Sequence, residues 1–168
     1  WDVGDVLNIY NTEYRTYKKR NLQLAVQRIV EWLATQRKQL NLSVKINLDP
    51  NLSIDPWFSQ TQWYDDNPAT IRQFQEWLTG TGPYQKGAAL DGKGNQLSLV
   101  LINKIAVQEW TQVSQIDPPR GPLDPYDPWY QLWVQFKRHL VSQHYADLAR
   151  WAAEVGMPPE QIYTGVSL

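Results

Sequence analysis

The chain has no cysteine, one methionine and only three phenylalanines among its 168 residues. The absence of cysteine excludes disulfide bonds and thiolate metal sites, and it leaves the redox compartment open. No uninterrupted apolar run approaches the roughly 18 residues that a membrane-spanning helix needs. The balance of 16 basic and 17 acidic residues argues against a nucleic-acid surface. We therefore expect neither nucleic-acid nor membrane partners.

Tryptophan and tyrosine are abundant, with nine of each in the chain. Aromatic side chains with a polar edge suit places where one face is buried and the other must form hydrogen bonds. Sugar rings present apolar C–H faces and hydroxyl edges, so this composition favours carbohydrate binding. Burial in an ordinary core or protein interface is the alternative for each individual tryptophan.

Periodicity and capping signals predict alternating strands and helices. Asn67-Pro68 and Asp127-Pro128 each combine a capping side chain with proline at the first helical position, and Gly80 and Gly156 end the helices that follow. The predicted strands are 6–10, 44–48 and 161–168, and the predicted helices are 17–40, 68–79, 97–110 and 128–155. The segment 49–66 is predicted to be a long aromatic loop, where function tends to reside.

This order predicts an α/β fold with about three parallel strands and long helices. Three strands cannot close a barrel, so the pattern indicates a single partial (β/α)8 domain over residues 1–168. We expect N- and C-terminal portions of the barrel to be missing, because the chain starts at Trp1 without an initiator methionine and stops after the last strand. The rest of the barrel or an oligomeric partner would complete it.

Polar residues follow two of the predicted strands. Asn11 and Glu13 come after the first strand, and Asp49 and Asn51 come after the second. Ligands bind at the carboxyl ends of parallel strands, so these side chains are expected to share one rim. Asp49 would orient a sugar hydroxyl or, equally, cap the following turn. Asn51 and Glu13 are site candidates whose alternative is a role in the loop alone.

Three aromatic residues of the long loop complete the predicted site: Trp57, Trp63 and Tyr64. They are candidates for stacking against sugar rings, and packing beneath the following helix is the alternative for Trp63 and Tyr64. By contrast, Trp77 lies on the apolar stripe of its helix and is expected in the core.

An ordered set of motifs resembles the bacterial glycoside hydrolases of the family 42 β-galactosidase type. The segments are 63–68 (WYDDNP), 71–78 (IRQFQEWL), 81–84 (TGPY), 117–120 (DPPR) and 127–129 (DPW). The resemblance implies a retaining glycosidase in which one carboxylic acid protonates the leaving oxygen and a second carboxylate about 5–5.5 Å away attacks the sugar. It also implies an acid/base glutamate where this chain has Asn51, and a nucleophile on a strand beyond Leu168.

The resemblance therefore implies an O-glycoside hydrolase parent whose catalytic competence is doubtful in this chain. Glu13 and Asp49 are the catalytic candidates, with an oligosaccharide or glycoside as ligand. The alternatives are a non-catalytic carbohydrate-binding relative and an α/β interaction scaffold. No cofactor or metal is predicted, because His139 and His144 are five residues apart rather than three or four.

Overall fold

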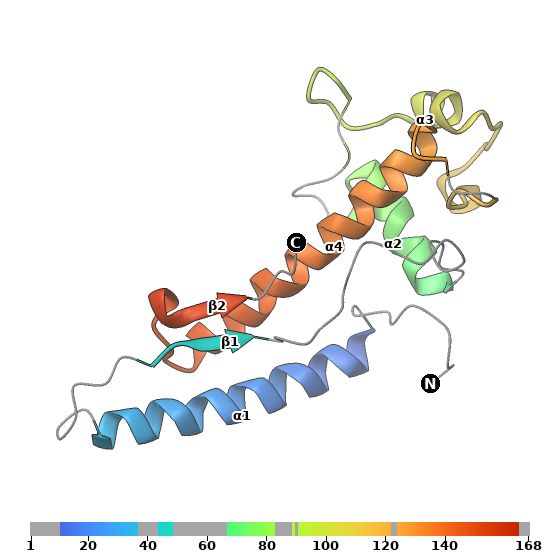
Figure 1. Ribbon diagram of the computed structural model, residues 1–168. Helices are drawn as coiled ribbons and strands as arrows, with labels where there is room; N and C mark the ends of the chain where they lie inside the picture. The colour runs from blue at the N-terminus through green and yellow to red at the C-terminus, as the bar shows by residue number, and fades with distance from the viewer. Residues whose placement is uncertain are drawn as a thin grey trace. The chain divides into compact units, whose positions relative to one another are not determined.

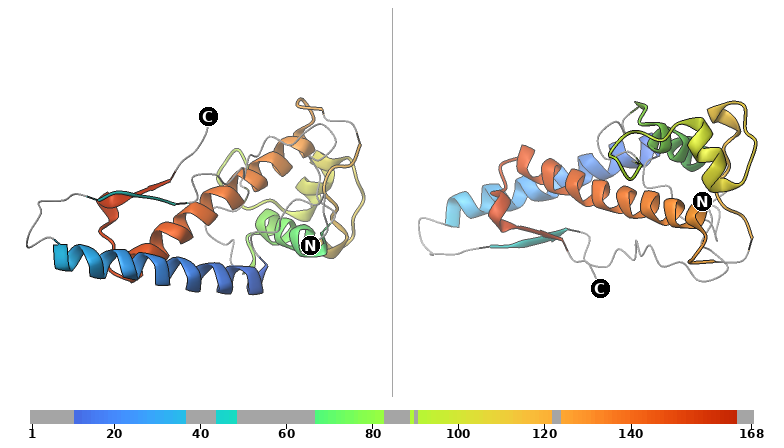
Figure 2. Two further views of the ribbon diagram at one scale, coloured as in Figure 1. Left: turned by 60° about the horizontal axis from the view of Figure 1, so that its bottom comes forward. Right: turned by 90° about the horizontal axis from the view of Figure 1, so that it is seen from above.

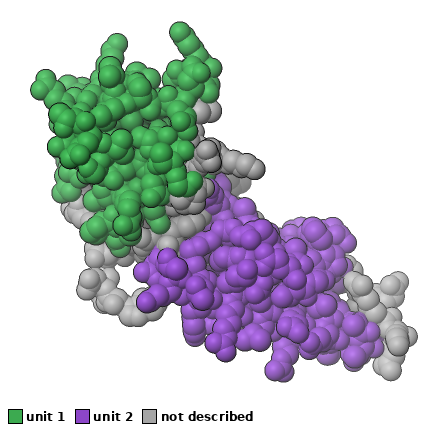
Figure 3. Space-filling view, turned by 180° about the vertical axis from the view of Figure 1, so that it is seen from behind, with its two compact units in different colours: residues 1–8, 56–140 green, residues 9–55, 141–168 purple. Residues whose placement is uncertain are grey.

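The computed structural model describes residues 11–36, 44–48, 67–82, 89, 91–121 and 124–164. The chain divides into two compact units, which Figure 3 shows in different colours. Unit 1 comprises residues 1–8 and 56–140, and unit 2 comprises residues 9–55 and 141–168. Helix α4, Pro128–Glu154, contributes to both units, because the division falls after residue 140.

Unit 1 contains the helices α2, Pro68–Thr79, and α3, Leu99–Ala106, and the 3-10 turn η2, Val113–Gln115 (Figure 1). Asn67 caps α2, because its side chain accepts a hydrogen bond from the backbone N–H of Ala69 at 2.9 Å. The helix ends at a left-handed residue with a φ of 65°, a conformation that glycine adopts with least strain. Both predicted ends of this helix are thus confirmed.

Helix α4 begins with the same arrangement. The carboxylate of Asp127 accepts a hydrogen bond from the backbone N–H of Trp129 at 2.9 Å, and Pro128 is the first helical residue. The helix is 27 residues long, and Gly156 follows it with a φ of 94°. The predicted long helix is therefore confirmed, close to its predicted bounds.

The core of unit 1 is aromatic. Phe74 of α2 is fully buried, and its ring centroid lies 5.0 Å from that of Trp133 and 5.2 Å from that of Phe136. The contact with Trp133 is edge-to-face, an arrangement that the ring quadrupoles favour. Trp77 is 3% exposed, which confirms its predicted place in the core. The apolar stripe of α2 is therefore buried against α4 residues 128–140.

Unit 2 contains α1, Thr12–Gln36, residues 141–154 of α4 and a two-stranded parallel sheet. Strand β1, Ile46–Leu48, pairs with strand β2, Ile162–Thr164, and the two strands lie side by side in Figures 1 and 2. The 3-10 turn η3, Pro159–Gln161, leads into β2. The parallel direction agrees with the prediction for these two strands.

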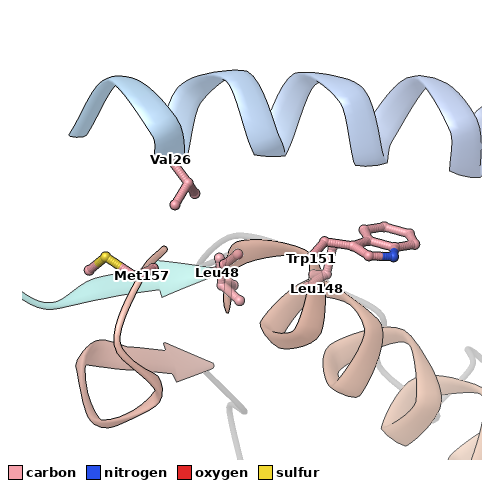
Figure 4. Packing of buried hydrophobic residues seen from close by; sticks show 6 residues of the cluster. Val26, Leu48, Leu148, Trp151 and Met157 are labelled. Atoms are coloured by element: carbon pink, nitrogen blue, oxygen red, sulfur yellow. The ribbon is translucent and has the colours of Figure 1, made fainter. Parts of the chain in front are cut away.

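One cluster of buried residues joins α1, the sheet and α4 in unit 2. Its members are Val26, Leu48, Leu148, Trp151, Ala152 and Met157. Figure 4 shows Val26 pointing from α1 toward the layer formed by β1 and α4. Leu48, the last residue of β1, is 3% exposed, so one face of the short sheet is covered by this cluster.

The predicted partial (β/α)8 barrel is wrong. About two-thirds of the described residues are helical, and within them the only sheet has two strands of three residues each. The chain is therefore not a three-stranded barrel fragment. Alternation of strand-like and helix-like segments suggested a repeating unit, but strand pairing depends on contacts distant in sequence. The predicted strand 6–10 lies outside the described residues.

Several predicted boundaries also change, and the strand predicted over 44–48 is present as the shorter β1. Helix α1 begins at Thr12 rather than Tyr17, because Asn11 caps it. The helix predicted over 97–110 is present as the shorter α3. The strand predicted over 161–168 is described only as β2, and residues 165–168 lie outside the described part.

Candidate functional site

Two of the predicted site residues lie at the start of α1. The side-chain oxygen of Asn11 accepts a hydrogen bond from the backbone N–H of Tyr14 at 3.0 Å, so Asn11 acts as the helix cap. Glu13 is exposed in the first helical turn, where the helix dipole favours a negative charge. Both positions have a local structural role that requires no ligand.

The other predicted site residues lie outside the described residues. They are Asp49, Asn51, Trp57, Trp63 and Tyr64. The predicted rim of Glu13, Asp49 and Asn51 is therefore untested and stays a prediction. In sequence, Asp49 directly follows Leu48, the last residue of β1.

The exposed face of the short sheet carries polar and aromatic side chains. Asn47 of β1 lies opposite Tyr163 of β2 in the parallel register. Side chains alternate along a strand, so both residues lie on the face opposite buried Leu48. Asn47 is exposed, Tyr163 is 46% exposed, and the Nζ atom of Lys45 lies 5.1 Å from the centroid of the Tyr163 ring. This face therefore offers an amide, a cation and a half-exposed ring.

This sheet face was not among the sites predicted from the sequence. Lys45 and Asn47 are the polar members of the alternating segment 44–48, so their common side could have been predicted from period two. The pairing of Asn47 with Tyr163 could not, because it joins residues more than 100 positions apart. For Tyr163, the sequence indicated only that its side chain lies on one face of a predicted strand. It gave no indication of the residue on the neighbouring strand.

A second polar arrangement, which we call the polar seam, joins α1 to α4 within unit 2. It consists of Arg15, Lys19 and Gln23 on α1 and Asp147, Arg150, Trp151 and Glu154 on α4. Arg15 pairs with Asp147, and Lys19 Nζ lies 2.9 Å from a carboxylate oxygen of Glu154. The residues of α1 recur every four positions, which places them on one side of the helix.

Glu154 of the polar seam is unsuited to general acid catalysis. Hydrogen bonding to Lys19 holds the pKa of Glu154 below its usual value, with the charge of Arg150 acting in the same direction. A general acid at neutral pH needs a raised pKa, so that it still carries its proton. Asp147 accepts hydrogen bonds from both Arg15 and Arg150. The seam is therefore a structural network.

Both histidines of the chain, His139 and His144, lie on α4. Burial lowers the pKa of His139, whose ring centroid lies 6.2 Å from that of Trp77. His144 is 1% exposed. In the described parts of the chain, no group of three or more His, Cys, Asp or Glu side chains could hold a metal ion.

Comparison with known proteins identifies no relative. The chain matches no protein-family model, no curated protein and no solved structure. The helices of the described segments were also assessed as membrane spans, and none of them is both long enough and apolar enough to cross a bilayer.

Proposed function

We propose that the chain binds carbohydrate and does not itself hydrolyse glycosides. Its site would combine the exposed sheet face with the segment that follows β1. The observation that supports the proposal best is the register pair of Asn47 and Tyr163, because a half-exposed ring beside an amide suits the apolar face and hydroxyl edge of a sugar. The resemblance of the sequence motifs to family 42 glycoside hydrolases favours a galactoside.

The expected chemistry explains why binding is proposed without hydrolysis. The two-carboxylate mechanism needs one carboxylic acid to protonate the leaving oxygen. Asn51 stands where the resemblance implies that acid, and an amide has no proton to donate in this way. Asp49 and Glu13 remain the proposed carboxylates that would accept hydrogen bonds from sugar hydroxyl groups, with Trp57, Trp63 and Tyr64 as proposed stacking residues.

Titration of the purified chain with galactose, lactose and longer galactosides tests the proposal. Calorimetry should detect saturable binding, and Tyr163→Ala should weaken it about tenfold, since a stacked ring contributes roughly 1–1.5 kcal/mol. Tyr126→Ala is the matched control, because Tyr126 is 87% exposed and belongs to unit 1. No saturable response to any galactoside would overturn the proposal. Turnover of an aryl galactoside by the unmodified chain would contradict its non-catalytic part.

A helical interaction module is the second candidate function. The observation that favours it is the burial of Trp77, Trp129, Trp133 and Trp151, each at most 6% exposed. These rings stabilise the units and are not available to a sugar, so part of the high tryptophan content has a purely structural explanation. The absence of a saturable response to any galactoside would favour this candidate over carbohydrate binding.

A further inference from the structure

Lys45 places a positive charge on the exposed face of the two-stranded sheet. Its Nζ atom lies 5.1 Å from the centroid of the Tyr163 ring, and both side chains are exposed, Tyr163 at 46%. Asn47 lies opposite Tyr163 in the register and is exposed on the same face. A cation is therefore part of the face that the proposed carbohydrate site uses.

The charge of Lys45 is not neutralised within the described chain. The ion pairs that join described residues of unit 2 all belong to the polar seam, and Lys45 takes part in none of them. The described carboxylate nearest to Tyr163 in the sequence is Glu160, in the turn before β2, and it forms no ion pair with Lys45. The ammonium group of Lys45 can therefore donate its N–H groups to an anion of a ligand without breaking an existing ion pair.

The contact between Lys45 and Tyr163 makes the ring selective. A sugar that stacks on the side of Tyr163 where the ammonium group lies must displace that group from the ring. A neutral sugar offers no charge in return, so the favourable cation–π contact is lost. A sugar with an anionic group offers the displaced ammonium group a charge-assisted hydrogen bond, and the flexible lysine stem allows that movement. The arrangement therefore favours an anionic sugar over a neutral one.

The proposed carboxylate Asp49 does not oppose this preference. Lys45 precedes β1 in the sequence, whereas Asp49 follows it, so the two charges stand at opposite ends of the strand in the sequence. Hydroxyl groups of a sugar suit a carboxylate acceptor, and an anionic group of the same sugar suits the ammonium donor. A ligand with both kinds of group would therefore bind in one orientation along the strand.

We infer that the carbohydrate bound at this sheet face is an acidic sugar whose carboxylate or sulfate group pairs with Lys45. The inference rests on the proposed carbohydrate function and names the ligand class of that site. Tyr163 stacks against the sugar ring, Asn47 bonds a hydroxyl group, and Lys45 determines the specificity. Among galactosides, a galacturonide or a sulfated galactose is the expected ligand.

Two matched pairs of sugars test the inference. Trigalacturonate and its methyl-esterified twin have the same rings, but only trigalacturonate carries carboxylates. Calorimetric titration of the complete chain at low salt should show about fivefold tighter binding of trigalacturonate, and added salt should narrow this difference. Sulfated galactose against galactose forms the second pair, which distinguishes a sulfate ligand from a carboxylate ligand.

Substitution of Lys45 separates the charge from the stacking. Lys45→Met removes the charge and keeps a flexible apolar side chain. It should abolish the preference for the acidic sugars and leave the affinity for the methyl ester within about twofold of its original value. Lys93→Met is the matched control, because Lys93 is exposed in unit 1 and its loss changes the net charge equally. Lys45→Glu should reverse the preference, since like charges repel.

The possible results separate this inference from the proposed function. Equal affinity for the acidic and the neutral member of both pairs would overturn the acidic-sugar inference and leave carbohydrate binding intact. A preference for acidic sugars that Lys45→Met does not reduce would also overturn it, because the anion would then bind elsewhere. Binding of none of the four sugars would overturn the proposed function and the inference together.

Discussion

The guanidinium carbon of Arg15 lies 5.0 Å from the centroid of the Trp151 ring, and the same side chain pairs with Asp147. Trp151 belongs to the buried cluster of unit 2, so the cation and its carboxylate partner lie at the edge of that core. Lys19 lies 6.0 Å from the same ring. The polar seam and the apolar cluster therefore meet at Trp151 and together hold α1 against α4.

Removal of the Arg15 charge should destabilise unit 2. We expect Arg15→Met, which keeps an apolar stem of similar length, to lower the free energy of unfolding by about 2 kcal/mol. The loss has two sources, the cation–π contact and a carboxylate left without one of its partners. Urea denaturation followed by circular dichroism measures the change. Arg20→Met is the control on the same helix and should change stability by less than about 0.5 kcal/mol.

The cation–π part can be isolated by a double-mutant cycle. Arg15→Met and Trp151→Leu should show a coupling energy of about 0.5–1 kcal/mol, because each variant alone removes the same contact. Additive effects of the two substitutions would mean that Arg15 acts only through Asp147.

Acid should weaken the contact between α1 and α4. Pairing with Lys19 lowers the pKa of Glu154 from its ordinary value of 4.5. The unfolded chain therefore binds a proton at Glu154 more readily than the folded protein does. The stabilisation from the Lys19–Glu154 pair is fully present above about pH 4.5, and it is lost as the pH falls through the lower pKa that Glu154 has in the folded protein. We expect the urea midpoint to fall between about pH 6 and pH 3.

Glu154→Gln should flatten this pH dependence, since an amide does not titrate. Glu160→Gln is the matched control, because Glu160 is exposed and forms no ion pair within the described chain. A pH profile that Glu154→Gln leaves as steep as that of the unmodified chain would remove Glu154 from the explanation.

The sequence was sufficient to predict the features that depend on neighbouring residues. Asn67 and Asp127 each precede proline and cap a helix, and Gly80 ends one, because these effects act within a single helical turn. Trp77 was predictable as a core residue from the apolar stripe of its helix. The start of α1 was missed because Asn11 suits both the end of a strand and the cap of a helix.

Features that depend on distant residues were not predictable in the same way. The parallel pairing of β1 with β2 brings Asn47 opposite Tyr163, and the sequence contains no local signal for that partner. The barrel was inferred from element order, which does not reveal how many strands pair.

Val107 occupies an unfavourable backbone conformation that glycine should relieve. Its φ of 54° and ψ of 50° lie in the left-handed region, which is strained for a β-branched residue, and its side chain is 85% exposed. We expect Val107→Gly to raise the free energy of unfolding by about 1 kcal/mol, after allowing for the greater freedom of glycine in the unfolded chain. Chemical denaturation measures this gain.

Val100→Gly is the matched control for Val107→Gly. Val100 is also exposed, but it lies within α3, where glycine costs about 0.5 kcal/mol relative to valine. The two substitutions should thus change stability in opposite directions. A loss of stability in both variants would show that Val107 is not strained.

Phe74 should be the most sensitive position in unit 1. Its fully buried ring contacts aromatic residues of both α2 and α4, so truncation removes several contacts and leaves a cavity between the helices. We expect Phe74→Ala to lower the free energy of unfolding by about 4 kcal/mol and Phe74→Leu by roughly 1–2 kcal/mol. Tyr126→Ala, at an 87% exposed aromatic residue, should cost less than about 0.5 kcal/mol. If Phe74→Ala were no more costly than Tyr126→Ala, the aromatic cluster would not be the element that joins α2 to α4.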